Sequence, residues 1–253
     1  MSKDKKFEDF FNRSKGIIES IDILIAYDEK HNNLAPYVGN IFCPECRNAQ
    51  LHFVRSKTPH LRTNPSSQHL PGCSYHYEYV KNKTVVEYLE ALTPEQVESR
   101  LNAMMRLLMP DQRNPETGEN LTEENNPLLF DEGKSGKTGT KTKKTIRRQR
   151  LSGWIAKDIA GDLYLFYGDV KITSEEKLSK NNHKYHEWIL KTKNKDGEWK
   201  YRTKLYRGTQ LQEFKEDCVY KIVFIGTPSF DRGYMSIELE NRNAVLYREI
   251  TET

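Results

Sequence analysis

Three of the four cysteines lie in one stretch with several histidines, and these residue types bind transition metals. Residues 43–46 read Cys-Pro-Glu-Cys, and His69 and Cys73 follow in one short loop. A two-residue gap lets successive thiolates grip one ion from a tight turn, and four Cys and His ligands complete the tetrahedral shell of a structural zinc. We therefore predict a structural Zn²⁺ bound by Cys43, Cys46, His69 and Cys73.

Other interpretations of the same residues remain open. His76 could replace His69, and His60 is a weaker candidate in the intervening loop. A catalytic zinc would keep one coordination position open for water. A disulfide is disfavoured because we see no signal peptide, so we expect reduced thiols. A redox Cys-x-x-Cys would start a helix in a βαβ unit, whereas its flanks here are typical of hairpins.

The residues around the zinc stretch also resemble those of a known family. Ala26-Tyr27-Asp28 precedes Phe42-Cys43-Pro44-Glu45-Cys46, and Pro59-His60-Leu61-Arg62 and His69 follow. With this arrangement, residues 23–77 resemble the zinc-ribbon-like N-terminal domain of competence CoiA-like proteins. Leu61 stands where that family prefers Phe, and His69 comes later than in its pattern. The resemblance implies a link to DNA uptake, mobile elements or phage biology, and it implies no enzyme.

The elements that must position the zinc ligands are a helix and short strands. Apolar residues at partly helical spacing predict a helix over residues 7–21, and a β-rich run predicts a strand over 23–27. A second strand is expected over 50–55. The alternation of Tyr75, Tyr77 and Tyr79 is typical of one face of a further strand.

Residues 84–109 are the clearest helical region of the sequence. Thr93 is expected to cap a second helix that begins with Pro94, and Pro110 ends it. We expect this helical hairpin to bury the zinc module. Residues 1–110 would then form one zinc-binding domain.

A flexible basic linker is predicted over residues 111–150. Its first half is rich in Asn, Glu, Pro and Gly, while residues 134–150 hold eight Lys or Arg and no Asp or Glu. This density of positive charge favours non-specific, salt-dependent contacts with phosphates, although a solvated linker is the alternative. The residues expected to bind nucleic acid are Lys141, Lys143, Lys144, Arg147, Arg148 and Arg150.

Residues 151–253 are predicted to form a β domain. Apolar and polar residues alternate over 162–172, 183–192 and 198–206, and a helix over 209–217 precedes strands over 219–225 and 234–239. Three strands, a helix and two strands is the order of an OB-type barrel, with SH3-like and other small barrels as alternatives. The fold class expected for the whole chain is α+β.

OB barrels bind single-stranded nucleic acid by stacking bases on exposed aromatic rings beside a basic groove. The rings of this domain are interleaved with cations, and at least half of the rings are expected in the core. On the strand at 198–206, strict alternation puts Trp199 and Tyr201 on one face and places the cations Lys200, Arg202 and Lys204 on the other. This separation argues against a single groove.

Composition narrows the function further. Mean hydropathy is −0.82, 30% of residues are charged, and no apolar run approaches the roughly 20 residues that span a bilayer. We expect a cytoplasmic, zinc-containing nucleic-acid-binding accessory protein without a membrane partner, and DNA rather than RNA as its ligand. The alternatives are an adaptor for a recombinase or another DNA-processing protein, and a metal-dependent nuclease using Asp22, Asp28 and Lys30. The nuclease pattern is weak, and no nucleophile arrangement stands out, which favours a non-enzyme.

Overall fold

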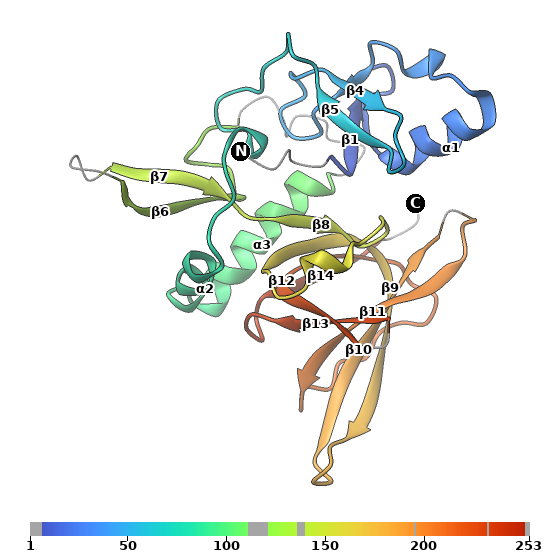
Figure 1. Ribbon diagram of the computed structural model, residues 1–253. Helices are drawn as coiled ribbons and strands as arrows, with labels where there is room; N and C mark the ends of the chain where they lie inside the picture. The colour runs from blue at the N-terminus through green and yellow to red at the C-terminus, as the bar shows by residue number, and fades with distance from the viewer. Residues whose placement is uncertain (1–6, 111–120, 136–139, 195, 232, 251–253) are drawn as a thin grey trace. The chain divides into compact units, whose positions relative to one another are not determined.

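The computed structural model describes residues 7–110, 121–135, 140–194, 196–231 and 233–250 (Figure 1). The described part combines strands with three α-helices, so the α+β class is confirmed. The chain divides into two units, residues 1–81 with 106–146 and residues 82–105 with 147–253.

The first unit contains small sheets. One antiparallel sheet, in the order β2-β1-β3, contains β1 (Asp9–Asn12), β2 (Ile17–Ser20) and β3 (Ile41–Phe42). Two hairpins follow along the chain. The first pairs β4 (Leu51–Val54) with β5 (His60–Thr63), and the second pairs β6 (Leu129–Ser135) with β7 (Thr140–Thr145). Helix α1 (Ile21–His31) and the 3-10 turns η1 (Ala35–Tyr37) and η2 (Ser74–His76) complete it. The strand predicted at 50–55 is confirmed as β4.

Two elements of the N-terminal region are the reverse of the prediction. The expected helix over 7–21 is the β1–β2 hairpin, whose turn contains Gly16 at φ +70°. The expected strand over 23–27 lies inside α1, where the Ser20 hydroxyl caps the helix by accepting from the Asp22 N–H at 3.3 Å. A glycine free to adopt positive φ and a serine N-cap decide both elements. The strand expected from Tyr75 to Tyr79 is also wrong, because η2 occupies residues 74–76.

The flexible linker predicted over 111–150 is wrong where strands are described. β6 and β7 pair in an antiparallel hairpin, and β8 (Arg148–Arg150) joins the large sheet of the second unit. Phe130 and Ile146 are buried beside this charged sequence. The hydrophobic contacts of these two side chains explain why a highly charged segment still folds.

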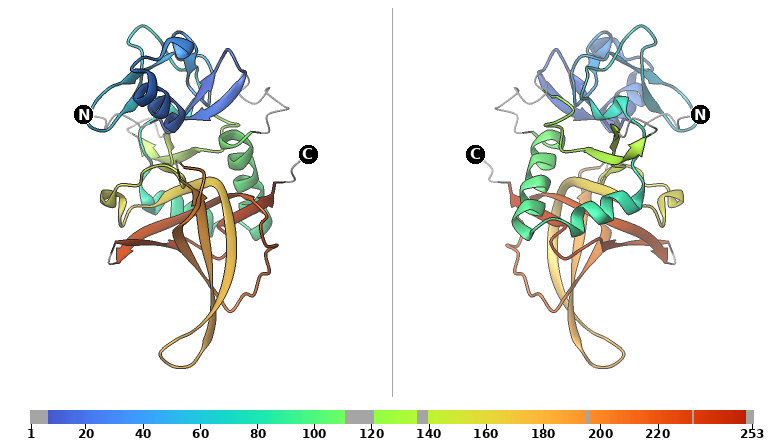
Figure 2. Two further views of the ribbon diagram at one scale, coloured as in Figure 1. Left: turned by 90° about the vertical axis from the view of Figure 1, so that its right-hand side faces the viewer. Right: turned by 90° about the vertical axis from the view of Figure 1, so that its left-hand side faces the viewer.

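The second unit is built on a ring of strands. Its strands are β8, β9 (Tyr164–Leu178), β10 (Lys184–Lys193), β11 (Trp199–Gly208), β12 (Tyr220–Asp231), β13 (Tyr234–Leu239) and β14 (Val245–Glu249). β9 to β13 each pair with two neighbours in the ring, in the cyclic order β9-β10-β11-β13-β12. Only the β11–β13 pair of this ring is parallel. Figure 2 shows these strands curling round on themselves.

The core of the second unit lies inside this ring. Inward side chains such as Phe166, Leu190, Leu205 and Phe224 are fully buried. β9 to β13 confirm the positions of the five predicted strands, which were 162–172, 183–192, 198–206, 219–225 and 234–239. β8 and β14 were not predicted. The helix expected over 209–217 is wrong, because no helix is described between β11 and β12. Phe214 instead packs edge-on against Trp188, with ring centroids 5.0 Å apart.

The helical hairpin is confirmed as α2 (Asn82–Glu90) and α3 (Pro94–Leu108). Thr93 and Gln96 cap α3 reciprocally, since the Gln96 N–H donates to the Thr93 hydroxyl and the Thr93 N–H donates to the Gln96 side chain. Residues 82–105 belong to the unit of the strand ring. That the hairpin buries the zinc module stays a prediction.

Candidate metal centre

The first two candidate ligands come from a tight turn directly after β3. The Cys43 N–H donates to the Ala49 carbonyl at 2.8 Å, and the Arg47 N–H donates to the Cys43 carbonyl at 3.0 Å. Arg47 adopts a left-handed conformation with φ +53°. These bonds close the turn, so that both thiols of the Cys-x-x-Cys motif face the same point.

The other two candidate ligands come from the loop that leads into η2. The Cys73 N–H donates to the Leu70 carbonyl at 3.1 Å, and Gly72 lies between them at φ +84°. A Cβ at Gly72 would lie 2.6 Å from the carbonyl carbon of Thr122. Only glycine allows the two backbone segments to approach this closely.

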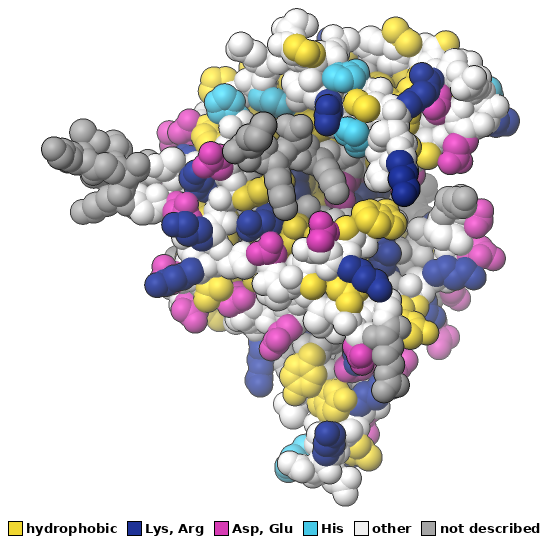
Figure 3. Space-filling view, in the orientation of Figure 1, with side chains coloured by type: hydrophobic (Ala, Val, Ile, Leu, Met, Phe, Trp, Pro, Cys, Tyr) yellow, Lys and Arg dark blue, Asp and Glu magenta, His cyan; other side chains and the backbone are white. Residues whose placement is uncertain are grey.

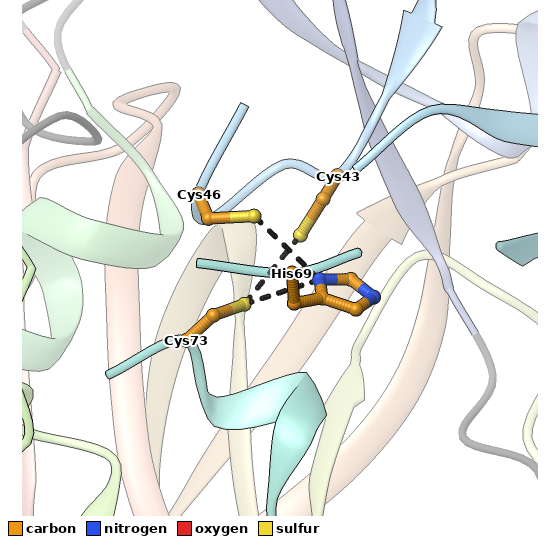
Figure 4. A group of neighbouring side chains, drawn as sticks. All are labelled: Cys43, Cys46, His69 and Cys73. Atoms are coloured by element: carbon orange, nitrogen blue, oxygen red, sulfur yellow. Dashed lines mark hydrogen bonds between the residues drawn. The ribbon is translucent and has the colours of Figure 1, made fainter. Parts of the chain in front are cut away.

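The four side chains converge as the sequence predicted (Figure 4). The ligand atoms of Cys43, Cys46, His69 and Cys73 all lie within 4.8 Å of one another. Cys43 Sγ is 3.8 Å from Cys73 Sγ, and His69 Nδ1 is 3.5 Å from Cys46 Sγ and 3.4 Å from Cys73 Sγ. A tetrahedral zinc would separate two sulfurs by about 3.8 Å and a sulfur from a nitrogen by about 3.5 Å, given its usual bond lengths. The spacing therefore fits such an ion.

The alternative histidines point elsewhere. His60 Nδ1 lies 3.0 Å from the Thr58 carbonyl, and the His76 ring lies edge-on to Tyr77. Neither belongs to the cluster of ligand atoms. Of the alternatives that the sequence left open, the structure brings only His69 to the three thiols.

The electrostatics of the thiols also suit a cation. All three are free cysteines, and burial raises the pKa of Cys43 and Cys73 well above the usual thiol value. Hydrogen bonding from Cys43 lowers the pKa of Cys46. Buried thiols this close cannot all ionise together, since their charges repel. A divalent ion removes this conflict by neutralising the thiolates.

A second layer of side chains fixes the ligands. His69 Nε2 lies 3.1 Å from the Thr63 hydroxyl, an arrangement that would leave Nδ1 free to bind a metal. Glu45 is only 3% exposed, and its carboxylate accepts from the Ser74 N–H and hydroxyl at 2.5 Å each and from the Asn126 amide at 2.6 Å. No sequence pattern pointed to Asn126, because it lies 81 residues away from Glu45.

Several of the predicted nucleic-acid-binding cations form ion pairs. Lys143 pairs with Asp131 at 2.8 Å, and Lys144 pairs with Glu78. In the second unit, Arg147 lies 3.9 Å from the Asp162 carboxylate, and Arg148 and Arg150 lie in β8. The side chain of Lys141 lies outside the described residues. Ion pairing reduces the free positive charge that the sequence suggested.

The predicted nuclease triplet lies on α1. Asp28 accepts two hydrogen bonds from Arg55, at 2.8 and 2.5 Å, and this contact lowers its pKa. Asp22 sits at the helix N-terminus beside Ser20. Within the described part of the chain, the cluster with metal-ligand spacing is the Cys and His group.

Comparisons with known proteins found no match to this chain. No family model matches the chain, and no curated protein or solved structure matches it. The resemblance to CoiA-like proteins stays a prediction. Among the described residues, no helix has the length and apolar character needed to cross a membrane.

Proposed function

We propose that this protein binds single-stranded nucleic acid on an outer face of its strand ring, while a structural Zn²⁺ holds its first unit together as a zinc-ribbon-like module. The ligand spacing of the metal centre and its buried hydrogen-bonded surroundings support the zinc. The resemblance of residues 23–77 favours DNA over RNA. No catalytic step is part of the proposal.

The ring of β9 to β13 supports an OB-type barrel. An OB-fold is a five-stranded Greek-key barrel that binds oligonucleotides on the face of its second and third strands. Here those strands are β10 and β11, and the ring contains five strands that each pair with two neighbours. The order β9-β10-β11-β13-β12 differs from a simple meander, as a Greek key requires.

A β-bulge is the observation that carries the proposal. Leu190 pairs with Thr203, but the next residue, Lys191, pairs with Tyr201. Arg202 is therefore the extra residue, and the bulge shifts the alternation of β11 by one position. Because Leu190 and Thr203 are fully buried, their neighbours Lys191 and Tyr201 point outward together. Strict alternation along the sequence had placed Tyr201 opposite the cations of β11.

The outer face of β10 and β11 consequently carries paired aromatic rings. Tyr185 lies beside Tyr206, with centroids 5.4 Å apart, and Tyr201 meets Tyr234 edge-on at 5.9 Å. Tyr201, Tyr206 and Tyr234 are 41%, 58% and 68% exposed. We call these four tyrosines with Lys191 the tyrosine face. In Figure 3, hydrophobic and Lys or Arg side chains lie next to one another over the lower part of the view.

Most of the lysines around this face are paired with glutamates, so its excess positive charge is small. Lys204 pairs with Glu187 at 2.7 Å, and Lys177 pairs with Glu175 at 2.6 Å. Within the part of the chain that the structure describes, Lys191 has no ion-pair partner. Base stacking should therefore contribute more than phosphate contacts, at about 1–3 kcal/mol per stacked base.

The test is the binding of a fluorescent oligothymidylate, measured by anisotropy over a range of salt concentrations. One phosphate contact, made by Lys191 of the tyrosine face, predicts a slope of log K against log salt of about −0.7. Binding by all eight cations of residues 134–150 would instead give about −5.6. Tyr201→Ala should weaken binding by about tenfold or more, because one stacking ring is lost.

Matched variants separate the two candidate surfaces. Leu211→Ala removes another exposed apolar side chain of the second unit and should leave affinity unchanged. Changing both Lys143 and Lys144 to Ala should have little effect, since both pair with acids. A steep salt slope, or a loss of binding in the Lys143 and Lys144 variant with full binding in Tyr201→Ala, would contradict the proposal.

A further inference from the structure

Buried polar atoms without a hydrogen-bond partner gather at one end of the strand ring. They are Ser174 Oγ on β9, His186 Nδ1 and Trp188 Nε1 on β10, and Arg207 Nε on β11. Trp188 pairs with Ser174 on one side and with the core residue Leu205 on the other, so these positions face inward. Buried polar groups are almost always hydrogen-bonded, and such a gathering indicates a missing partner.

Arg207 is the most unusual member of this cluster. It is the extra residue of a second bulge, since Glu187 pairs with Tyr206 and His186 pairs with Gly208. Its side chain is only 8% exposed, and its guanidinium lies 4.3 Å from the centre of the Trp188 ring. Bulges recur beside functional sites because they redirect a side chain. Arg207 follows the inward Leu205 by two positions and so faces the barrel interior, and the bulge leaves it without a paired residue on β10.

The charge of Arg207 has no carboxylate partner among the residues that the structure describes. Its two terminal nitrogens donate to neutral oxygens, the Arg242 carbonyl at 3.0 Å and the Gln210 side chain at 3.1 Å. No carboxylate of the described residues forms an ion pair with it. Burial lowers the pKa of Arg207; the nearby Tyr247 hydroxyl opposes this shift, and the charge of Arg242 adds to it.

Nearby groups increase the positive charge. The guanidinium of the exposed Arg242 lies over Gly208, where a Cβ would be 3.7 Å from its Nη2 atom. Glu176 is opposite His186 in the β9–β10 register, but its carboxylate pairs with Lys184 at 3.0 Å. Arg242 thus lies beside Gly208, which is opposite His186 in the β10–β11 register, and the carboxylate of Glu176 on the neighbouring strand is already engaged by Lys184.

We propose that Arg207, Arg242 and His186, with Trp188 and Ser174, form a binding site for a phosphate group. A buried ionised group is costly unless it is paired and hydrogen-bonded. A phosphate carries up to two negative charges and several acceptor oxygens, which match two guanidinium groups and the unpartnered N–H and O–H groups of the cluster. The site goes beyond the proposed function, because it lies on inward positions, whereas the tyrosine face lies on outward ones.

Calorimetric titration of the full chain with inorganic phosphate, at constant ionic strength kept with chloride, tests the site. The unchanged protein should bind phosphate and melt at a higher temperature in its presence. Arg242→Ala should weaken phosphate binding by about tenfold or more, since one charged hydrogen-bond partner is lost, and this exposed residue is not needed for folding. Arg207→Met should remove the binding.

Two controls keep this result separate from the proposed function. Arg248→Ala removes an exposed arginine of β14 and should leave the phosphate affinity unchanged. Tyr201→Ala should weaken oligonucleotide binding but not phosphate binding. Failure of the phosphate site would therefore leave the tyrosine face intact, and the reverse also holds.

Oligonucleotides with a 5′-phosphate or a 5′-hydroxyl identify the source of the phosphate. A preference for the 5′-phosphate that Arg242→Ala abolishes supports the end of a strand as the ligand. Phosphate binding without such a preference supports a free anion. The proposal is overturned if inorganic phosphate neither binds nor raises the melting temperature, or if Arg207→Met binds it as well as the unchanged protein.

Discussion

Glu45 in the first unit and Arg207 in the second are both buried ionisable side chains, but their surroundings differ. Glu45 in the first unit is 3% exposed and accepts three hydrogen bonds of 2.5–2.6 Å. Arg207 in the second unit is 8% exposed, has only neutral acceptors and leaves its Nε without a partner. The first charge is satisfied by the fold, which indicates a structural role. The second requires a partner from outside, which indicates binding.

The difference follows from how each unit obtains its stability. The first unit has short strands and a small core around the ligand cysteines. Such a segment needs a metal ion and a complete hydrogen-bond network in place of a large core. The strand ring has a larger core of fully buried aliphatic and aromatic side chains. It can therefore retain an incompletely satisfied group at one end.

Loss of the metal should have the largest effect, because it should destabilise the first unit and not the second. Cys43→Ser, or chelation, should unfold the first unit, because structural zinc sites contribute on the order of 10 kcal/mol to folding. The strand ring should remain folded. Limited proteolysis with mass spectrometry would show new cleavage sites within residues 7–81 and none within 164–239.

Cys218→Ser is the matched control for this prediction. Cys218 is partly buried in the second unit and lies outside the cluster of metal ligands. This variant should bind one zinc ion per chain and resist proteolysis as the unchanged protein does. Stable folding of the first unit in metal-free protein would show that this unit does not depend on a metal ion for its stability.

Sequence reasoning found the Cys43, Cys46, His69 and Cys73 cluster because its spacing is local. The Cys-x-x-Cys turn and the His69–Cys73 loop each place two ligands within a few residues, and only one ion has to join them. The helical hairpin was also predictable, since Thr93 and Pro94 mark the start of α3. In the N-terminal region, by contrast, Gly16 and Ser20 outweighed the apolar periodicity.

The remaining features depend on contacts that the sequence does not display. A bulge at Arg202 in β11 sets the direction of Tyr201, and a bulge depends on the partner strand. The bonds of Asn126 to Glu45 join residues 81 positions apart. Lys143 and Lys144 look free in the sequence but find acids in the fold. Strand register and distant pairing are therefore what the sequence analysis missed.

Glu45→Gln tests the satisfied charge of the first unit. The substitution keeps the shape of the side chain but removes the charge that strengthens three hydrogen bonds. We expect a loss of about 1–3 kcal/mol in the free energy of unfolding of the zinc-bound protein, measured by urea denaturation. Glu29→Gln, at an exposed position on α1, should change it by less than about 0.5 kcal/mol. Equal effects of the two substitutions would show that the network around Glu45 is not structural.

Arg207→Met should raise the free energy of unfolding, where Glu45→Gln lowers it, and its effect should be the smallest of the three. Methionine has a similar length, fits against the Trp188 ring and carries no charge to desolvate. The acceptors that lose their donor belong to Gln210 and Arg242, both exposed residues that water can reach. Replacement of a buried ionic group by an apolar one of similar volume is often neutral or stabilising.

For Arg207→Met we expect a gain of about 0–1 kcal/mol in the free energy of unfolding in phosphate-free buffer, measured by the same urea denaturation. This gain should disappear when phosphate is added, because only the arginine protein is stabilised by the anion. A loss of several kcal/mol in phosphate-free buffer would place Arg207 with Glu45 as a structural charge.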